Sequence, residues 1–389
     1  MHSPQHRTRK RLGFKSWMAI AGMGVAGAGL LPVVSPGLAT VNYQMRDPQL
    51  PLGHLNRSVV TESGFVATTV ARGTGGASQP DDVTTMAHHL FVAFQNGIHA
   101  KGQPAPNGAT ASTIVEYGGH GRVLARWNLT GHVDGLTADP GDNRLLATVN
   151  EDGNSSFYVI HPGMPAGRQV QHLTYSPAPD TAPLTSPIAS GGGPDSITVL
   201  GDKIYISASA PLPDAQGRFT HAALFRATIS GSRVLLAPAL MGNAPATSIA
   251  TGAATTLNLS DPDSNTSVPA SVPGVGGDIV LDSQGDGQLV FVHGAGTPSQ
   301  SSSMLPLGTQ VNDVAFATSV AGTLYVTDTV ANKVIAITGR FTPGTAFVAA
   351  PHDSGVAGCV GTLDLTRGTI RPFAINMQSP SGMIFVPRS

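Results

Sequence analysis

The sequence predicts an all-β protein whose main part is a single β-propeller. Glycine (47) and proline (30) are abundant among the 389 residues and charged residues make up only 12%, a mixture typical of many short strands joined by turns. No segment carries a long apolar stripe at helical spacing. A short motif led by an aspartate recurs along the chain, and recurrence of this kind is typical of propeller blades.

The first 39 residues predict a signal peptide. A basic patch without acidic residues precedes the apolar run 17–34, and the small residues of 35–39 offer a site for signal peptidase. We therefore expect a periplasmic or secreted protein, exported by the Sec or the twin-arginine route, with residues 40–389 forming the propeller domain. The alternative is an uncleaved membrane anchor, and this segment would then be the protein's contact with a membrane.

Charge and cysteine content narrow the classes of partner. Residues 40–389 hold 17 basic and 23 acidic side chains, so the formal charge of the mature chain is −6. A mildly acidic chain has no electrostatic reason to bind nucleic acid, and we expect no nucleic-acid partner. Cys359 is the only cysteine, so no disulfide forms within the chain.

The repeated motif is a turn residue, an aspartate, a small or apolar residue and then a β run. A second apolar run follows each copy but the last, and third and fourth runs follow some, which gives about four strands in about fifty residues. This count predicts six blades. Seven blades also fit the sequence, because the last gap between copies contains two extra runs, 360–365 and 369–375. A β-sandwich would show about seven to nine strands, fewer than the sequence suggests. The copies are Pro80-Asp81-Asp82-Val83, Val133-Asp134-Gly135-Leu136, Pro194-Asp195-Ser196-Ile197, Gly277-Asp278-Ile279-Val280, Asn312-Asp313-Val314-Ala315 and, with serine for aspartate, Pro380-Ser381-Gly382-Met383.

The spacing of the copies predicts one insertion and a closed ring. Successive copies lie 53, 61, 83, 35 and 68 residues apart. The longest gap contains residues 241–275, which are rich in Ala, Thr, Ser and Pro and are interpreted as a loop insertion. The last copy stops one strand into its blade, so we expect outer strands from the N-terminal side, within residues 58–70, to complete it. Closure by both termini would remove two exposed sheet edges.

One segment carries a family resemblance. Residues 323–337 contain a Tyr-Val-x-Asp strand, an Asn-containing turn and another strand, and they resemble a blade of the NHL or SMP-30/gluconolactonase type. The resemblance implies a six-bladed propeller. Lactonases of the SMP-30 group hold one divalent cation in the central channel with a Glu, two Asn and an Asp, and Asn312 with one of Asp134, Asp195 and Asp278 matches two of these ligands. The Glu-Gly-Pro start that supplies the glutamate in that group is absent here.

The aspartates of the motif are the candidate site. If each begins an innermost strand, their carboxylates gather at one mouth of the channel, where oxygen ligands suit Ca²⁺ or another hard divalent cation. The alternative is that each aspartate accepts backbone N–H bonds at its own turn. His132, next to Val133-Asp134, is a candidate base or ligand, whereas His88 and His89 are expected in a solvated hairpin. The candidate metal ligands are Asp134, Asp195, Asp278, Asn312 and Asp313.

Two functional hypotheses follow. The first is an exported binding module that takes a small molecule or a protein at the propeller face, because no set of catalytic residues is recognisable and propellers carry function on their loops. The second is a lactonase or esterase in which a divalent cation polarises the ester carbonyl. A third possibility is a bare scaffold, which would respond to neither a metal ion nor a ligand. No Gly-x-Ser-x-Gly nucleophile motif occurs, and no catalytic residue is predicted.

Overall fold

The computed structural model describes residues 58–177, 192–350 and 358–388. Every described residue belongs to one compact unit of the chain. The predicted signal peptide lies outside the described residues. Within them, no helix is long and apolar enough to cross a membrane.

The structure confirms the all-β class. The described residues form five sheets and two single-turn 3₁₀ helices, η2 (Gly119–Gly121) and η3 (Gln284–Asp286). The first sheet contains β3 (Pro80–Met86), β4 (His89–Phe94), β5 (Ala111–Tyr117) and β6 (Val123–Thr130). The eight-stranded second sheet contains β7 (Val133–Asp139), β8 (Arg144–Val149), β9 (Ser156–Ile160), β10 (Val170–Ser176), β11 (Pro194–Leu200), β12 (Lys203–Ala208), β13 (Ala222–Ser230) and β14 (Arg233–Met241).

Three further sheets complete the architecture. The third contains β15 (Pro245–Ser248), β16 (Ala254–Thr256), β17 (Pro262–Ser267), β18 (Ile279–Ser283), β19 (Gln288–His293) and β20 (Ser301–Pro306). The fourth contains β21 (Asp313–Phe316), β24 (Ala346–Ala350), β25 (Gly358–Leu363), β26 (Ile370–Met377) and β1 (Val60–Thr61). The fifth contains β27 (Pro380–Pro387), β22 (Ala321–Asp328), β23 (Lys333–Arg340) and β2 (Val66–Arg72).

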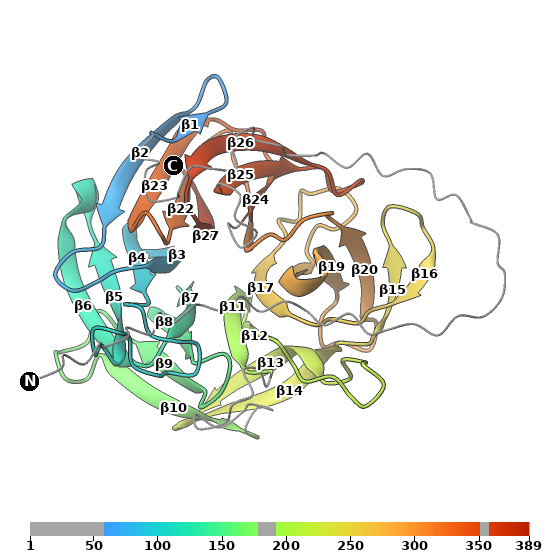
Figure 1. The fold of residues 1–389 in the computed structure, drawn as a ribbon, viewed down its shortest axis with the longest axis horizontal. Coiled ribbons are helices and arrows are strands. Elements are labelled where there is room, and N and C mark those ends of the chain that lie inside the picture. Colours follow the sequence, from blue (N-terminus) through green and yellow to red (C-terminus); the bar gives the residue numbers. More distant parts are fainter. Residues whose placement is uncertain (1–57, 178–191, 351–357, 389) are drawn as a thin grey trace, which may run out of the picture. The chain divides into compact units, whose positions relative to one another are not determined.

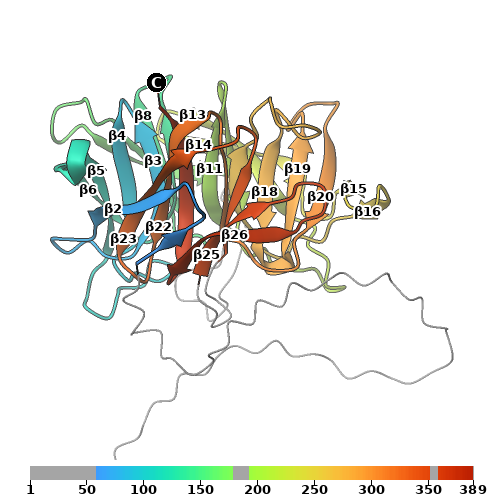
Figure 2. The same cartoon turned by 90° about the horizontal axis from the view of Figure 1, so that it is seen from above.

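The innermost strands of the sheets surround a common centre, as in a β-propeller (Figure 1). β3, β7, β11, β17, β21 and β27 each contact the next in this order, and β27 contacts β3, which closes the circle. Their neighbours step outward within each sheet, and the strands run between the same two faces (Figure 2). The second strands β4, β8, β12 and β18 are almost wholly buried between sheets, so their apolar runs were the clearest signal in the sequence.

The sheet count differs from six for a specific reason. β10 and β14 pair in parallel, with Thr174 opposite Arg233 and Ser176 opposite Leu235. This contact joins the four-stranded run β7–β10 to the four-stranded run β11–β14, so the two form one sheet at their outer edges. The described residues therefore form five sheets, which do not by themselves confirm the predicted six blades.

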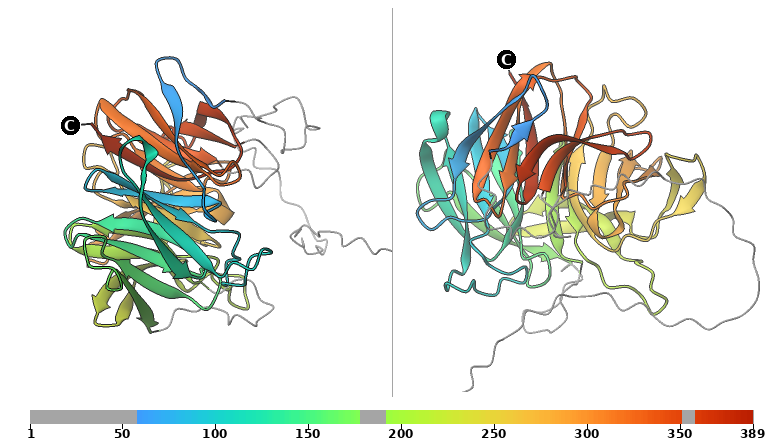
Figure 3. Two further views of the ribbon diagram at one scale, coloured as in Figure 1. Left: turned by 90° about the vertical axis from the view of Figure 1, so that its left-hand side faces the viewer. Right: turned by 45° about the horizontal axis from the view of Figure 1, so that its top comes forward.

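The chain closes as predicted through strands from both ends of the described residues. β2 pairs with β23 and β27 pairs with β22, so β2 and the last strand share one sheet, while β1 pairs with β26; the blue and red strands lie together in Figure 3. The Phe65 ring packs edge-on against Phe341 and Phe373, with centroids 5.0 and 4.8 Å apart. Aromatic contacts of this geometry stabilise the closure beyond the apolar area they bury.

Two details of the sequence interpretation are wrong. The predicted loop insertion 241–275 holds β15, β16 and β17, and β17 is one of the six central strands. The apolar run 324–327 is the second run after the Asn312-Asp313 copy in the sequence and was expected beside it. It lies in another sheet, because the chain crosses after β21 to form β22 and β23 beside β27 and then returns for β24. Six residues hold the same place at the start of the six central strands, and they are 53, 61, 68, 49 and 69 positions apart, which removes most of the irregular spacing. They are Asp81, Asp134, Asp195, Asp263, Asn312 and Ser381.

Candidate functional site

A β-bulge at the start of the central strands positions the site. The pairing shifts register between Pro80 and Val83 in β3, and at the same place in β7, β11 and β17. A bulge leaves its extra residue outside the regular alternation of the strand and re-aims its side chain. The first bulged residues, with the matching positions before β21 and in β27, are Asp81, Asp134, Asp195, Asp263, Asn312 and Ser381.

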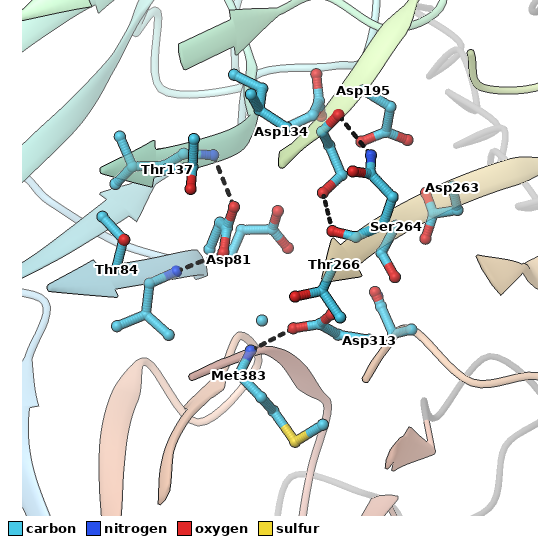
Figure 4. A pocket seen from close by; sticks show the side chains of 18 of the residues that line it. Asp81, Thr84, Asp134, Thr137, Asp195, Asp263, Ser264, Thr266, Asp313 and Met383 are labelled. Atoms are coloured by element: carbon cyan, nitrogen blue, oxygen red, sulfur yellow. Dashed lines mark hydrogen bonds between the residues drawn. The ribbon is translucent and has the colours of Figure 1, made fainter. Parts of the chain in front are cut away.

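The second bulged position holds two structural aspartates. Asp82 accepts the N–H of Val83 at 2.6 Å and the N–H of Leu136, on the neighbouring β7, at 2.6 Å. Asp313 accepts the N–H of Val314 at 2.7 Å and the N–H of Met383, on β27, at 2.5 Å (Figure 4). These equivalent bonds show that Asp313 corresponds to Asp82, and Asn312 to Asp81. The alternative reading of the motif, an aspartate that accepts backbone N–H bonds, holds for both residues.

The central strands enclose a polar pocket with a cavity volume of about 290 Å³. Among the described residues that line it, none is a lysine or an arginine. Four of the five predicted ligands, Asp134, Asp195, Asn312 and Asp313, line this pocket. The acidic lining residues are Asp81, Asp82, Asp134, Glu151, Asp195, Asp263 and Asp313.

Three carboxylates converge in one part of the pocket. Glu151, Asp195 and Asp263 each offer an oxygen, and the three oxygens lie within 4.8 Å of one another. Asp195 is 6% exposed, and its Oδ2 has no hydrogen-bond partner among the residues that the structure describes. Burial raises the pKa of Asp195 well above its usual value, and the charges of Asp263, Glu151 and Asp134 raise it further. A buried carboxylate oxygen without a partner is costly unless a cation or a proton satisfies it.

The fixed position of Glu151 comes from its local backbone. β8 ends at Val149, and Asn150 takes a left-handed conformation with φ 65°, which asparagine tolerates well. The side chain of Asn150 accepts the N–H of His132 at 2.9 Å, and the N–H of Glu151 donates to Asp134 Oδ2 at 3.2 Å. Burial raises the pKa of Glu151 well above its usual value, and the charges of Asp134 and Asp263 add to this.

His132 lies beside this cluster with both ring nitrogens engaged. Nδ1 is 2.5 Å from the carbonyl oxygen of Ile98 and Nε2 is 2.9 Å from Asp134 Oδ1. Burial by itself lowers the pKa of His132, but the charges of Asp134, Glu151 and Asp81 outweigh it and raise the pKa to about 10. Because both ring nitrogens face oxygen acceptors, the ring is not a free general base.

Asp278 is not part of the pocket, which corrects the sequence prediction. It precedes β18, a second strand of its sheet, and its Oδ1 lies 2.9 Å from His293 Nδ1. Its apolar run Ile279–Leu281 imitated the start of a central strand, whereas the actual central strand reads Pro-Asp-Ser-Asn-Thr-Ser. The predicted set of five ligands therefore does not meet at one point. His88 lies, as expected, in the turn between β3 and β4.

Sequence reasoning missed Asp263 and Glu151. Pro262-Asp263-Ser264 repeats the letters of Pro194-Asp195-Ser196, so a search for the motif without the following apolar run would have found Asp263. Glu151 has no such signal, because a lone glutamate after a strand is common. Only the bend at Asn150 brings it into the pocket.

A further buried carboxyl lies behind the pocket wall. Thr148, Ser207 and Thr327 occupy one position of the second strands, and each hydroxyl donates to the backbone carbonyl of an aspartate in the next central strand. The pairing register places Asp282 at the same position of β18. Asp282 is 1% exposed, and neither of its oxygens has a hydrogen-bond partner within the described part of the chain. Burial raises the pKa of Asp282 well above its usual value, and the charges of Asp263, Asp313 and Asp261 raise this pKa further.

We expect Asp282→Thr to stabilise the protein, by about 1–3 kcal/mol at pH 8, because it restores the hydroxyl found at this position of β8, β12 and β22 and removes a buried acid. The gain should be smaller at pH 5, where holding the proton on Asp282 costs less. Urea unfolding of both proteins at the two pH values measures this. Thr148→Val, which removes a hydroxyl from the same position, should destabilise; a loss of stability in Asp282→Thr at pH 8 would contradict the assignment.

The comparisons with known proteins give similarity to solved structures alone. No protein-family model matches the chain, and no curated protein matches it. A periplasmic gluconolactonase of Pseudomonas aeruginosa is similar at 15% identity, over 79% of this chain and 88% of that one, with a TM-score of 0.44. A protein of unknown function from Bacteroides thetaiotaomicron is similar at 7% identity, over 84% and 70% of the two chains, with a TM-score of 0.46.

TolB of Acinetobacter baumannii is similar at 12% identity, over 84% of this chain and 67% of that one, with a TM-score of 0.39. The similar solved structures include a gluconolactonase, one of the two protein types that residues 323–337 resemble. The resemblance to NHL repeats stays a prediction. Likeness at these identities and scores carries no argument about function, so the proposals below depend on the site itself.

Proposed function

We propose that this propeller protein binds a hard divalent cation in its central pocket and uses the cation to hold a small, oxygen-rich ligand. The observation that carries the proposal is the convergence of Glu151, Asp195 and Asp263 oxygens within 4.8 Å of one another. A cation such as Ca²⁺, with bonds of about 2.3–2.6 Å to oxygen, can touch all three at once. It would also satisfy Asp195 Oδ2, which the described residues leave without a partner.

The rest of the pocket supports a polar ligand. Ca²⁺ takes about six to eight oxygens, so three carboxylates leave positions for water or for hydroxyl and carboxylate groups of a ligand. Neutral side chains line the remaining walls and can hydrogen-bond such groups. These are Thr84, Gln95, Thr137, Asn265, Thr266, Gln284 and Asn312.

Calorimetric titration of the chelator-treated protein with Ca²⁺ tests the proposal. We expect one binding event that weakens at least tenfold in Asp263→Asn and in Asp195→Asn, because each removes one charged ligand. Asp278→Asn is the matched control: this aspartate is also buried, lies outside the pocket and should leave the affinity unchanged. Equal affinity in all four proteins, or no binding by the unchanged protein, would refute the proposal.

A second candidate is a cation-assisted lactone or ester hydrolase. Asp81 lies in the same pocket, and burial, with the charges of Asp134 and Asp82, raises its pKa well above the usual value. A buried carboxyl with a raised pKa can exchange protons with a water molecule, as a general acid or base must. Turnover of a lactone and ester panel that requires Ca²⁺ and is lost in Asp81→Asn would favour the hydrolase. Saturable ligand binding without turnover would favour the binding module.

We also propose six blades and export of the mature chain. The eight-stranded sheet divides between β10 and β14 into two four-stranded runs, which together with the other four sheets gives six units, one for each central strand. Export after cleavage near residue 39 is supported by the basic and apolar pattern of residues 7–34. Sequencing the N-terminus of protein recovered from periplasm and medium tests the cleavage.

A further inference from the structure

We infer that a second cation position lies beside the first, built from His132, Asp134 and Glu151, and that it takes a transition-metal ion such as Zn²⁺. One ligand atom from each of these residues lies within 4.8 Å of the other two, and Glu151 belongs to this group and to the group with Asp195 and Asp263. A carboxylate with two oxygens can bridge two ions, as in dinuclear centres. The inference builds on the proposed function, because the two positions share Glu151.

The orientation of His132 points to a metal ligand. Its Nδ1 lies 2.5 Å from the carbonyl oxygen of Ile98, so Nδ1 carries a proton and the ring is fixed with Nε2 toward Asp134. Ligating histidines in metal sites are held in this way, with the second ring nitrogen donating to a carbonyl or carboxylate. Without metal, a proton bridges Nε2 and Asp134 Oδ1 across 2.9 Å, and an ion with bonds of about 2.0–2.2 Å would replace that proton.

The charge of the cluster agrees with two ions. Asp134, Glu151, Asp195 and Asp263 are four carboxylates in one pocket, and none of the described lining residues is a lysine or an arginine. With a neutral His132 they carry four negative charges, which two divalent cations balance. Asp195, which contributes an oxygen to the group with Glu151 and Asp263, is 6% exposed, and its Oδ2 has no hydrogen-bond partner among the described residues. One ion would leave this buried charge only partly compensated.

The two positions should differ in selectivity. The group with Glu151, Asp195 and Asp263 offers oxygen alone, which suits Ca²⁺. The group with His132 offers an imidazole nitrogen, which favours Zn²⁺ or Co²⁺ over Ca²⁺. A mixed centre of this kind places two different Lewis acids on either side of Glu151.

The test measures bound metal after equilibrium dialysis of the full mature chain against Zn²⁺ and Ca²⁺ together. We expect one Zn²⁺ and one Ca²⁺ per chain. His132→Gln should lose Zn²⁺ and keep Ca²⁺, Asp263→Asn should lose Ca²⁺ and keep Zn²⁺, and Glu151→Gln should weaken both at least tenfold. Retention of stoichiometric Zn²⁺ by His132→Gln would overturn the inference.

A second measurement uses the unaltered protein, so it tests the inference even if a variant does not fold. The Co²⁺-loaded protein should show one strongly shifted proton resonance that disappears in D₂O, from the Nδ1–H that donates to Ile98. Absence of this resonance refutes histidine ligation. The two proposals fail separately: Ca²⁺ binding without Zn²⁺ binding rejects this inference alone, and Zn²⁺ binding at His132 without Ca²⁺ binding rejects the proposed function alone.

Discussion

In the presence of a chelator, the free energy of unfolding should fall as the pH rises from about 4 to 7. Burial raises the pKa of Asp82 to about 7, and the pKa values of Asp81, Glu151, Asp195 and Asp313 lie well above their usual range. An unfolded chain loses these protons near pH 4, so the folded protein binds more protons between the two values. Stability then decreases as the pH rises, the reverse of the usual behaviour of paired carboxylates.

The size of the effect follows from the pKa difference. One pKa unit corresponds to about 1.4 kcal/mol, so Asp82 alone can account for up to about 4 kcal/mol between pH 4 and 7. Urea unfolding with EDTA at pH 4.5, 6, 7 and 8 measures the slope. Asp81→Asn should flatten the slope and raise the stability at pH 8, because Asn312 shows that an amide fits the same bulged position. Stability that rises from pH 4.5 to 8 would contradict the expectation.

Calcium should reverse this loss. A ligand at a hundred times its Kd stabilises the folded state by about 2.7 kcal/mol, and protonated carboxyls bind cations poorly. The gain from Ca²⁺ should therefore be larger at pH 8 than at pH 5. A gain that is equal at both pH values would show that the ion binds outside the carboxylate pocket.

The fold could be predicted where one strand is apolar and buried on both sides. The second strands, such as Leu90–Phe94 and Leu145–Val149, made the repeat visible. β17 was not predicted from the sequence, because a central strand faces the polar pocket and needs few apolar residues. The apolar run Ile279–Leu281 of the next strand was mistaken for the central strand. The sequence carries no local signal for the crossing of the chain after β21, which places β22 and β23 in the sheet of β27.

The site could be predicted only in part for a related reason. Asp134 and Asp195 were found because they repeat at the bulge, and a repeat marks backbone geometry rather than chemistry. The same signal also selected Asp313, whose bonds to Val314 and Met383 are structural. His132 was a candidate because it directly precedes Val133-Asp134, whereas Glu151 is not part of the repeat and could be placed in the pocket only from the folded chain.

Replacing Gly135 or Gly382 with alanine should destabilise the ring of central strands. A Cβ on Gly135 would lie 2.5 Å from the carbonyl oxygen of Asp195 and 2.9 Å from Ser196 Cα. A Cβ on Gly382 would lie 2.6 Å from the carbonyl oxygen of Asp81 and 2.8 Å from Asp82 Cα. Because these are backbone atoms of the next strand, a whole strand must move. We expect each variant to lose about 1–3 kcal/mol of unfolding free energy.

The two variants should differ in cation binding, which separates the site from the scaffold. Gly135 follows Asp134 and abuts Asp195, so Gly135→Ala should weaken Ca²⁺ binding at least tenfold. Gly382 abuts Asp81 and Asp82, outside the convergent carboxylates, so its variant should bind Ca²⁺ within about threefold of the parent. Gly141→Ala, whose new Cβ would meet its nearest atom at 3.6 Å, is the control and should change neither property. Equal loss of Ca²⁺ affinity in Gly135→Ala and Gly382→Ala would mean that the six central strands move together. The affinity would then depend on the packing of all six strands rather than on the three convergent carboxylates alone.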